Sequence, residues 1–281
     1  MSKRLVFIPL FLFILFFSTQ NLFAQKQINF LRVNFPPLWI TEGPLKEKGI
    51  ADAGENFIKE TIPHFSYKNI DVTVARAQSF MSGQNKKTYC AVPHGKDFFK
   101  NVIESKVWVA ISGHVLTSTQ EFIADLKSNK AVLNNQDQLI LAKFLNTSQK
   151  RGLITKGQKY PILDPILEPY RTNQIKDLVS TDMLSLYNMV LKQRADYTFQ
   201  YESTVKYLQK LNYDMKFITI EELNKHKVLI VVGCNDTLLA REFITELNKK
   251  IEGLRGIGLQ KMKEYHSPIT FENIKDFVPT K

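Results

Sequence analysis

Short β-like segments alternate with amphipathic helical segments over the first third of the chain, and this alternation is what most limits the possible folds. Apolar and β-branched runs predict strands over 27–33, 69–74 and 88–92, and helical spacing of apolar residues predicts helices over 52–61 and 76–81. A βαβαβ order is typical of a parallel sheet with crossover helices. The sequence therefore predicts the α/β fold class.

The same two patterns continue through the rest of the chain. Predicted strands cover 106–111, 130–133, 176–179, 197–200 and 227–232. Predicted helices cover 118–126, 136–145, 182–193, 203–211, a long segment from about 237 to 254, and 259–265. The last glycines, Gly253, Gly256 and Gly258, predict the end of the long helix. Residues 150–174 carry neither period and contain three prolines, so a loop or edge segment is expected there, at the mouth of a site.

This order of elements predicts two lobes, each with a mixed, mostly parallel sheet flanked by helices. Lobe 1 would comprise residues 25–114 and 221–281, and lobe 2, residues 115–220, would be inserted into it. A chain that crosses twice between lobes forms a hinge, and the gap between the lobes is a natural place for a ligand. A single continuous α/β sheet is the alternative that periodicity leaves open.

The first 24 residues have the layout of a secretory signal peptide. Lys3 and Arg4 precede an apolar run of about 13 residues, and the segment closes on the small residue Ala24. That run is shorter than the ~20 residues that a membrane-spanning helix needs. We therefore expect a periplasmic protein, with an uncleaved membrane anchor as the alternative.

The charge and the two cysteines limit the partners and the compartment. The net charge of the whole chain is +11, and it becomes +9 without the basic residues of the leader. No run of five like charges and no nucleic-acid reader motif occurs, so no nucleic-acid partner is expected. An oxidising compartment favours a disulfide between Cys90 and Cys234, which would stabilise the fold by ~4 kcal/mol in the chain-entropy model. Two separate buried thiols are the alternative.

Several segments resemble, in order, the type 2 periplasmic solute-binding proteins of family 3. The resemblance starts with Phe35-Pro36-Pro37 after the first strand, where two prolines predict an extended backbone, and with residues 48–52 at the start of a helix. It continues with residues 74–77, 193–197 and 227–254. These proteins bind amino acids and similar polar solutes, so the resemblance implies a two-lobed fold and a solute-binding function over nearly the whole mature chain.

The chain departs from this family at the residue that holds the ligand carboxylate. Amino-acid binders of the family carry a Thr-x-x-Arg step after the third strand, and its arginine grips the carboxylate with two hydrogen bonds. The matching residues here are Gly95-Lys96-Asp97-Phe98, so phenylalanine stands at the arginine position. The departure puts an ordinary free amino acid in doubt as the ligand.

The candidate ligand-binding residues lie after predicted strands or at helix starts, where loops line the crevice of an open α/β sheet. They are Phe35, Trp39, Arg76, His94, Gln136, Thr181, Asp182, Tyr201 and Glu202. Several have a structural alternative: core packing for Phe35 and Trp39, a surface ion pair for Arg76, an exposed loop position for His94 and a first-turn helix charge for Glu202. Asp182 would also block anion binding at its helix start if it caps that helix.

Catalytic motifs are scarce in this sequence. It contains neither Gly-x-Ser-x-Gly nor a phosphate-binding Gly-x-x-x-x-Gly-Lys, and its five histidines lack the spacing of zinc ligands. We therefore expect no cofactor, no metal and no enzyme. We expect a monomeric exported protein that closes on a small polar or anionic solute and delivers it to an inner-membrane transporter or sensor.

Two other functions stay open at this point. A periplasmic enzyme of the dehydratase or peptidoglycan-lyase type would use the same scaffold, with Glu202, Asp182 or His94 as acid or base. An interaction module without a ligand would have its cleft filled by its own side chains, such as Phe98 and Trp39.

Overall fold

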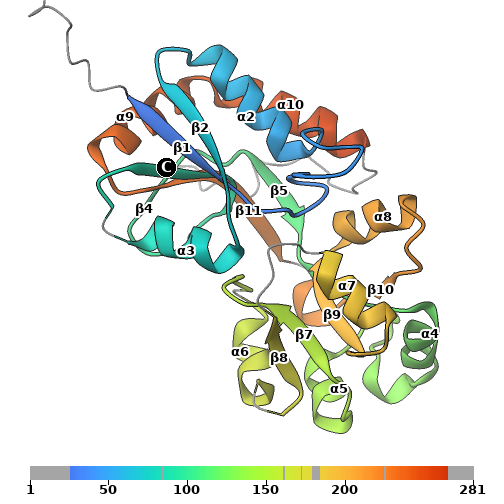
Figure 1. The fold of residues 1–281 in the computed structure, drawn as a ribbon. Coiled ribbons are helices and arrows are strands. Elements are labelled where there is room, and N and C mark those ends of the chain that lie inside the picture. Colours follow the sequence, from blue (N-terminus) through green and yellow to red (C-terminus); the bar gives the residue numbers. More distant parts are fainter. Residues whose placement is uncertain are drawn as a thin grey trace, which may run out of the picture.

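The computed structural model describes residues 26–83, 85–160, 162–171, 173–178, 184–224 and 226–264. In Figure 1 these residues form two bodies, each built on its own sheet, which we call sheet 1 and sheet 2. The predicted signal peptide at residues 1–24 lies outside the described residues. No helix among the described residues is long and apolar enough to cross a membrane.

Sheet 1 has the strand order β2-β1-β3-β11-β4, and β5 also pairs with β11. β1 runs parallel to β2 and β3, whereas β11 runs antiparallel to β3, β4 and β5. The predicted parallel βαβαβ unit is therefore confirmed. The strands are β1 (Gln27–Arg32), β2 (Ser66–Asp71), β3 (Thr88–Gly95), β4 (Val102–Glu104), β5 (Val109–Ser112) and β11 (Lys227–Asn235).

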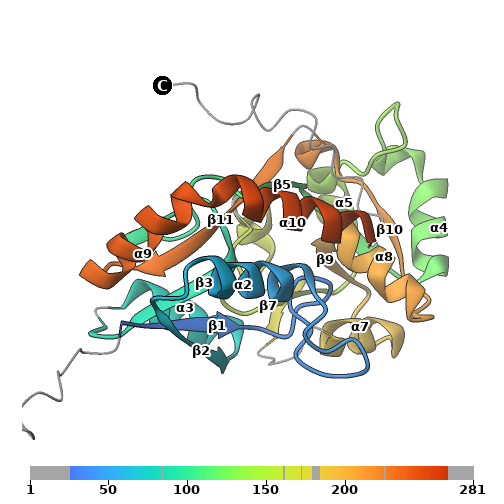
Figure 2. The same ribbon diagram turned by 90° about the horizontal axis from the view of Figure 1, so that it is seen from above.

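Two groups of helices cover the two faces of sheet 1 (Figures 1 and 2). Ile28 and Phe30 of β1 pack in the cluster that holds α2, α9 and α10, whereas Leu31 packs in the cluster that holds α3. This follows from the two-residue period of a strand, which sends successive side chains to opposite faces. The helices are α2 (Ile50–Thr61), α3 (Val74–Ser82), α9 (Leu238–Lys249) and α10 (Ile251–Glu264).

Sheet 2 has the order β10-β6-β9-β7-β8. β7 is parallel to β8 and β9, and β6 is antiparallel to β9 and β10. Its strands are β6 (His114–Ser118), β7 (Gly152–Thr155), β8 (Ile175–Leu178), β9 (Tyr197–Tyr201) and β10 (Lys216–Ile218). Its α-helices are α4 (Gln120–Ser128), α5 (Leu141–Thr147), α6 (Asp164–Leu167), α7 (Leu184–Leu191) and α8 (Glu202–Lys210). Three short 3₁₀ helices are η1 (Lys130–Val132), η2 (Glu168–Tyr170) and η3 (Glu221–Leu223).

The two sheets are separate, so the alternative of one continuous sheet is wrong. The chain crosses from sheet 1 to sheet 2 between β5 and β6, and it returns between β10 and β11. Cys234 of β11 lies opposite Cys90 of β3, and the two cysteines form a disulfide. The predicted disulfide is thus confirmed, and it closes a loop that contains the whole of sheet 2.

Several predicted elements need correction. The predicted strand 130–133 is η1, and the predicted helix 136–145 is confined to α5, because residues 134–138 form a turn held by the Asn134 side chain. The predicted loop 150–174 contains β7, α6 and η2. The predicted helix 118–126 begins later, because Ser118 ends β6 and Thr119 caps α4.

The glycines near the C-terminal end of the described chain do not end a helix. The break comes earlier, at Lys250, and the glycines lie inside α10. A Cβ on Gly253 would lie 2.5 Å from the Phe57 ring, and one on Gly258 would lie 2.5 Å from the Trp108 indole. Close packing of these rings against the helix backbone therefore outweighs the low helix propensity of glycine, which costs about 1 kcal/mol per residue relative to alanine.

Candidate functional site

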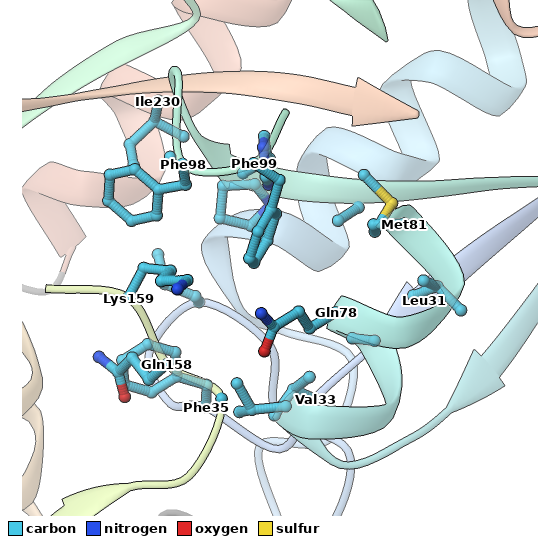
Figure 3. Close-up of a pocket in the computed structure, with 18 of the residues that line it drawn as sticks. Leu31, Val33, Phe35, Gln78, Met81, Phe98, Phe99, Gln158, Lys159 and Ile230 are labelled. Atoms are coloured by element: carbon cyan, nitrogen blue, oxygen red, sulfur yellow. The ribbon is translucent and has the colours of Figure 1, made fainter. Parts of the chain in front are cut away.

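A cavity of about 140 Å³ lies between the two sheets, where the C-terminal ends of β1, β3, β7 and β9 meet. This is the position at which open α/β sheets place their ligands. Figure 3 shows the side chains that surround it. Its walls are formed by Leu31, Val33, Phe35, Leu38, Trp39, Val74, Ala77, Gln78, Met81, Ala91, Pro93, His94, Gly95, Phe98, Phe99, Ile111, Gly157, Gln158, Lys159, Tyr201 and Ile230.

The turn after β1 brings two of the predicted residues, Phe35 and Trp39, to the cavity. The two prolines predicted an extended backbone here, but the segment forms a turn. The backbones of Phe35 and Trp39 form two hydrogen bonds with each other across it, at 3.0 and 3.1 Å. The Phe35 ring lies 6.1 Å from that of Tyr201 at the end of β9. Phe35 therefore contributes to the cavity and also joins the two lobes.

Trp39 is held in place by a carboxyl group from α2. Its indole Nε1 donates a hydrogen bond to Oε1 of Glu55 at 2.8 Å, and both side chains are buried. Burial raises the pKa of Glu55 to about 7, although the Trp39 hydrogen bond and the nearby Lys59 and Arg32 charges work in the opposite direction. A tryptophan in the cavity wall thus depends on a carboxyl group that titrates near neutral pH.

This raised pKa predicts a specific dependence of stability on pH. Between pH 4.5 and 7 the folded protein binds a proton at Glu55 that the unfolded chain does not bind, so this group lowers stability as the pH rises through that range. Replacing Glu55 with glutamine should remove the effect. The free energy of unfolding of the variant should rise relative to that of the wild type by about 3 kcal/mol between pH 4.5 and 8.

Urea unfolding at several pH values in that range would measure this difference. Glu60→Gln is the matched control, because Glu60 lies on the same helix and is exposed. A difference curve for Glu55→Gln as flat as that for Glu60→Gln would contradict the assignment.

Three aromatic rings from β3 and the turn after it form another wall of the cavity. His94 is buried at the end of β3 and lies 5.3 Å from the Phe99 ring, in a stacked arrangement. Phe98 lies directly against Gly95, where an added Cβ would come within 2.3 Å of the ring. The residue at the position of the family's carboxylate-binding arginine thus presents an apolar ring to the cavity.

The second lobe closes the cavity with the segment after β7 and with Tyr201. Gly157 has a φ of +86°, and a Cβ placed on it would lie 2.8 Å from Cα of Ala75 in α3. Only glycine combines that backbone conformation with such a close approach. Gly157 is therefore a contact point between the two lobes.

A buried histidine packs beside the segment that follows β7. His114 at the start of β6 is buried between the rings of Tyr160 and Tyr201, whose centroids lie 4.7 and 4.2 Å away. Burial lowers the pKa of His114 to about 3, so the ring is neutral at ordinary pH. Its Nε2 atom lies 3.4 Å from the amide nitrogen of Gln158. In the tautomer that carries its proton on Nδ1, Nε2 accepts this bond from the Gln158 amide group.

The structure brings together Phe35, Trp39, His94 and Tyr201 from the predicted set, but leaves three others away from the cavity walls. Arg76 is exposed, and its guanidinium lies over the Phe80 ring. Gln136 is exposed in the turn before α5, and Glu202 forms an ion pair with Lys206 one helical turn along α8, at 2.7 Å. Glu202 thus has the first-turn ion pair that the sequence left as its alternative, whereas Arg76 lies against an aromatic ring.

The remaining candidates, Thr181 and Asp182, lie outside the described residues.

Sequence reasoning missed several cavity residues. Gln78 and Met81 lie on α3, and their helical spacing indicated only a packing face. Gln158 and Lys159 lie in the segment expected at the mouth of a site, but no motif singled them out. An isolated glycine at position 157 before polar residues was the one available signal of a close contact.

Comparison with known proteins identifies the fold through similar solved structures, but no sequence family. No protein-family model matches the chain, and no curated protein matches it significantly. A solved amino acid ABC transporter substrate-binding protein from Streptococcus pneumoniae, bound to L-arginine, is similar with a TM-score of 0.63 at 12% identity, over 86% of this chain and 94% of that one.

Two further solved structures agree with this comparison. A putative L-cystine ABC transporter protein from Listeria monocytogenes has a TM-score of 0.61 at 15% identity, over 87% of this chain and 98% of the other. An ancestral amino acid-binding protein, a precursor of cyclohexadienyl dehydratase, has a TM-score of 0.58 at 9% identity, over 86% and 96%. The chain therefore has the two-lobed type 2 fold of the periplasmic substrate-binding proteins, as its sequence predicted.

Proposed function

We propose that this protein is an exported solute-binding protein that closes its two lobes around one small molecule and presents it to an inner-membrane transporter or sensor. The observation that carries this proposal is the cavity at the strand ends, whose walls come from both lobes. The fold supports it, because the similar structures are named as substrate-binding proteins of ABC transporters. The predicted signal peptide and the disulfide support a periplasmic location.

Several finer points belong to the same proposal. The lobes are residues 25–114 with 221–281, and residues 115–220; the protein acts as a monomer. Phe35, Trp39, His94 and Tyr201 contact the solute. Binding shifts the population toward the closed form to the extent that the solute has higher affinity for that form. Phe35 and Gly157, which contact the opposite lobe, support such a closed arrangement.

Native mass spectrometry of the purified mature protein tests the proposal, because a solute enclosed between the lobes should co-purify. Ala77→Phe should abolish this binding, since Ala77 lines the cavity on α3 and an added ring would fill the space. Ala142→Phe is the matched control on an exposed helix position away from the cavity. A co-purified molecule held equally by both variants would contradict the proposed site, and a compact state unchanged by solute in small-angle scattering would contradict closure.

A further inference from the structure

The described residues of the cavity wall carry almost no charge, which is unusual for a site that would hold an amino acid. Among the described residues that line the cavity there is no Asp, Glu or Arg, and the one cationic lysine, Lys159, is exposed. An ammonium or carboxylate buried without a charged partner is strongly disfavoured relative to water. A zwitterionic solute would therefore lose its hydration here without receiving two charged partners in exchange.

The cavity wall consists mainly of aromatic and aliphatic side chains. Rings come from both lobes: Phe35, Phe98 and Phe99 belong to the lobe of sheet 1, and Tyr201 belongs to the lobe of sheet 2. Leu31, Val33, Met81, Ile111 and Ile230 add aliphatic surface between them. Aromatic walls favour a flat apolar body, which gains from burial and from ring packing. The wall that the fold assembles therefore favours a less polar solute than the polar or anionic one expected from the sequence.

A few side chains give the cavity a limited polar component. In Figure 3 the carboxamide of Gln78 extends from α3 toward Lys159. His94 adds a buried ring, and its Nε2 lies 3.5 Å from Oε1 of Glu104.

The amide of Gln158 is less accessible than that of Gln78. Gln158 lines the cavity from the other lobe, but its Oε1 is fully buried and its nitrogen faces His114. One hydroxyl or amide group on the solute would therefore bond to Gln78, whose amide has both donors and an acceptor.

The cavity also limits the size of the solute. On a scale where one water takes roughly 10–15 Å³, a cavity of about 140 Å³ has space for a compact molecule on the order of ten non-hydrogen atoms.

We propose that the solute is a compact, uncharged molecule with an aromatic or similarly flat apolar body and a single hydroxyl or amide group that bonds to Gln78. This inference rests on the proposed solute-binding function, and it names the class of solute that the cavity accepts.

A series of ligands that share a phenyl ring and differ in the charge of the attached polar group tests this inference. Benzyl alcohol, benzoate, benzylammonium and phenylalanine would be compared by isothermal titration calorimetry and thermal shift with the mature protein. Benzyl alcohol should bind at least 10-fold more tightly than each charged or zwitterionic member. Gln78→Leu should weaken benzyl alcohol binding several-fold and leave toluene binding unchanged, whereas Gln136→Leu, away from the cavity, should change neither.

The outcomes separate this inference from the proposed function. Tighter binding of benzoate, benzylammonium or phenylalanine, or a charged co-purified molecule displaced by Ala77→Phe, would overturn the solute class and leave the function standing. If no co-purified molecule is found and no ligand of the series binds, the function itself fails, and this inference fails with it.

Discussion

Replacing Gly157 with alanine is expected to weaken solute binding by about 10- to 100-fold, which corresponds to about 1.4–2.8 kcal/mol. The added Cβ would lie 2.8 Å from Cα and 3.0 Å from the backbone nitrogen of Ala75 on the opposite lobe. Backbone atoms of a helix start do not move aside easily, so the lobes must separate. Alanine at a φ of +86° adds a local cost of about 1–2 kcal/mol. The closed form should therefore lose population, and the solute should lose affinity with it.

Two other glycines provide matched controls for this experiment. Gly43 has a φ of +80° with open space around it, so Gly43→Ala reproduces the backbone cost without the contact between lobes. Gly256 lies in α10 with open space around it and an ordinary φ, so Gly256→Ala should leave binding unchanged. Affinity for the co-purified solute would be measured by calorimetry, and lobe closure by small-angle scattering. Equal losses in Gly157→Ala and Gly43→Ala would show that contact between the lobes is not the cause.

Removing the disulfide is expected to lower the free energy of unfolding by about 3–5 kcal/mol. Cys90 and Cys234 are 144 residues apart in sequence, and closing so long a loop restricts the unfolded chain strongly, by about 4–5 kcal/mol in the chain-entropy model. A loss of this size is a large part of the free energy of unfolding of a typical domain, which is about 5–15 kcal/mol. Both cysteines are buried in the centre of sheet 1, so alanine also removes packed sulfur.

Urea unfolding of the Cys90→Ala, Cys234→Ala double variant would measure this loss against the oxidised wild type. Reduced wild-type protein is the control, and its stability should fall toward that of the double variant, since both lack the cross-link. Solute binding to the folded double variant should be retained, because neither cysteine lines the cavity. A loss below 1 kcal/mol would contradict a stabilising role for the bond.

The sequence by itself determined the type and approximate position of many helices and strands. The period-two pattern around Ile28 and Phe30 predicted β1, and the helical stripe of Leu239, Phe243 and Leu247 predicted α9. Each pattern shows which side of one element is buried. Short strands such as β4 and β10, of three residues each, have no readable period, so the sequence did not predict them.

Only the tertiary structure decided which side chains meet in the cavity and what they can bind. Phe98, Gln78 and Gln158 are distant in sequence and lie on different elements of two lobes, and only the fold brings them to one wall. Arg76 follows a strand as a ligand-binding residue would, but it lies outside the cavity because its position on α3 faces solvent. The spacing of apolar residues in one segment predicts which of its side chains are buried. It carries no information about which distant segments pack together, and that packing decides the chemistry of a cavity.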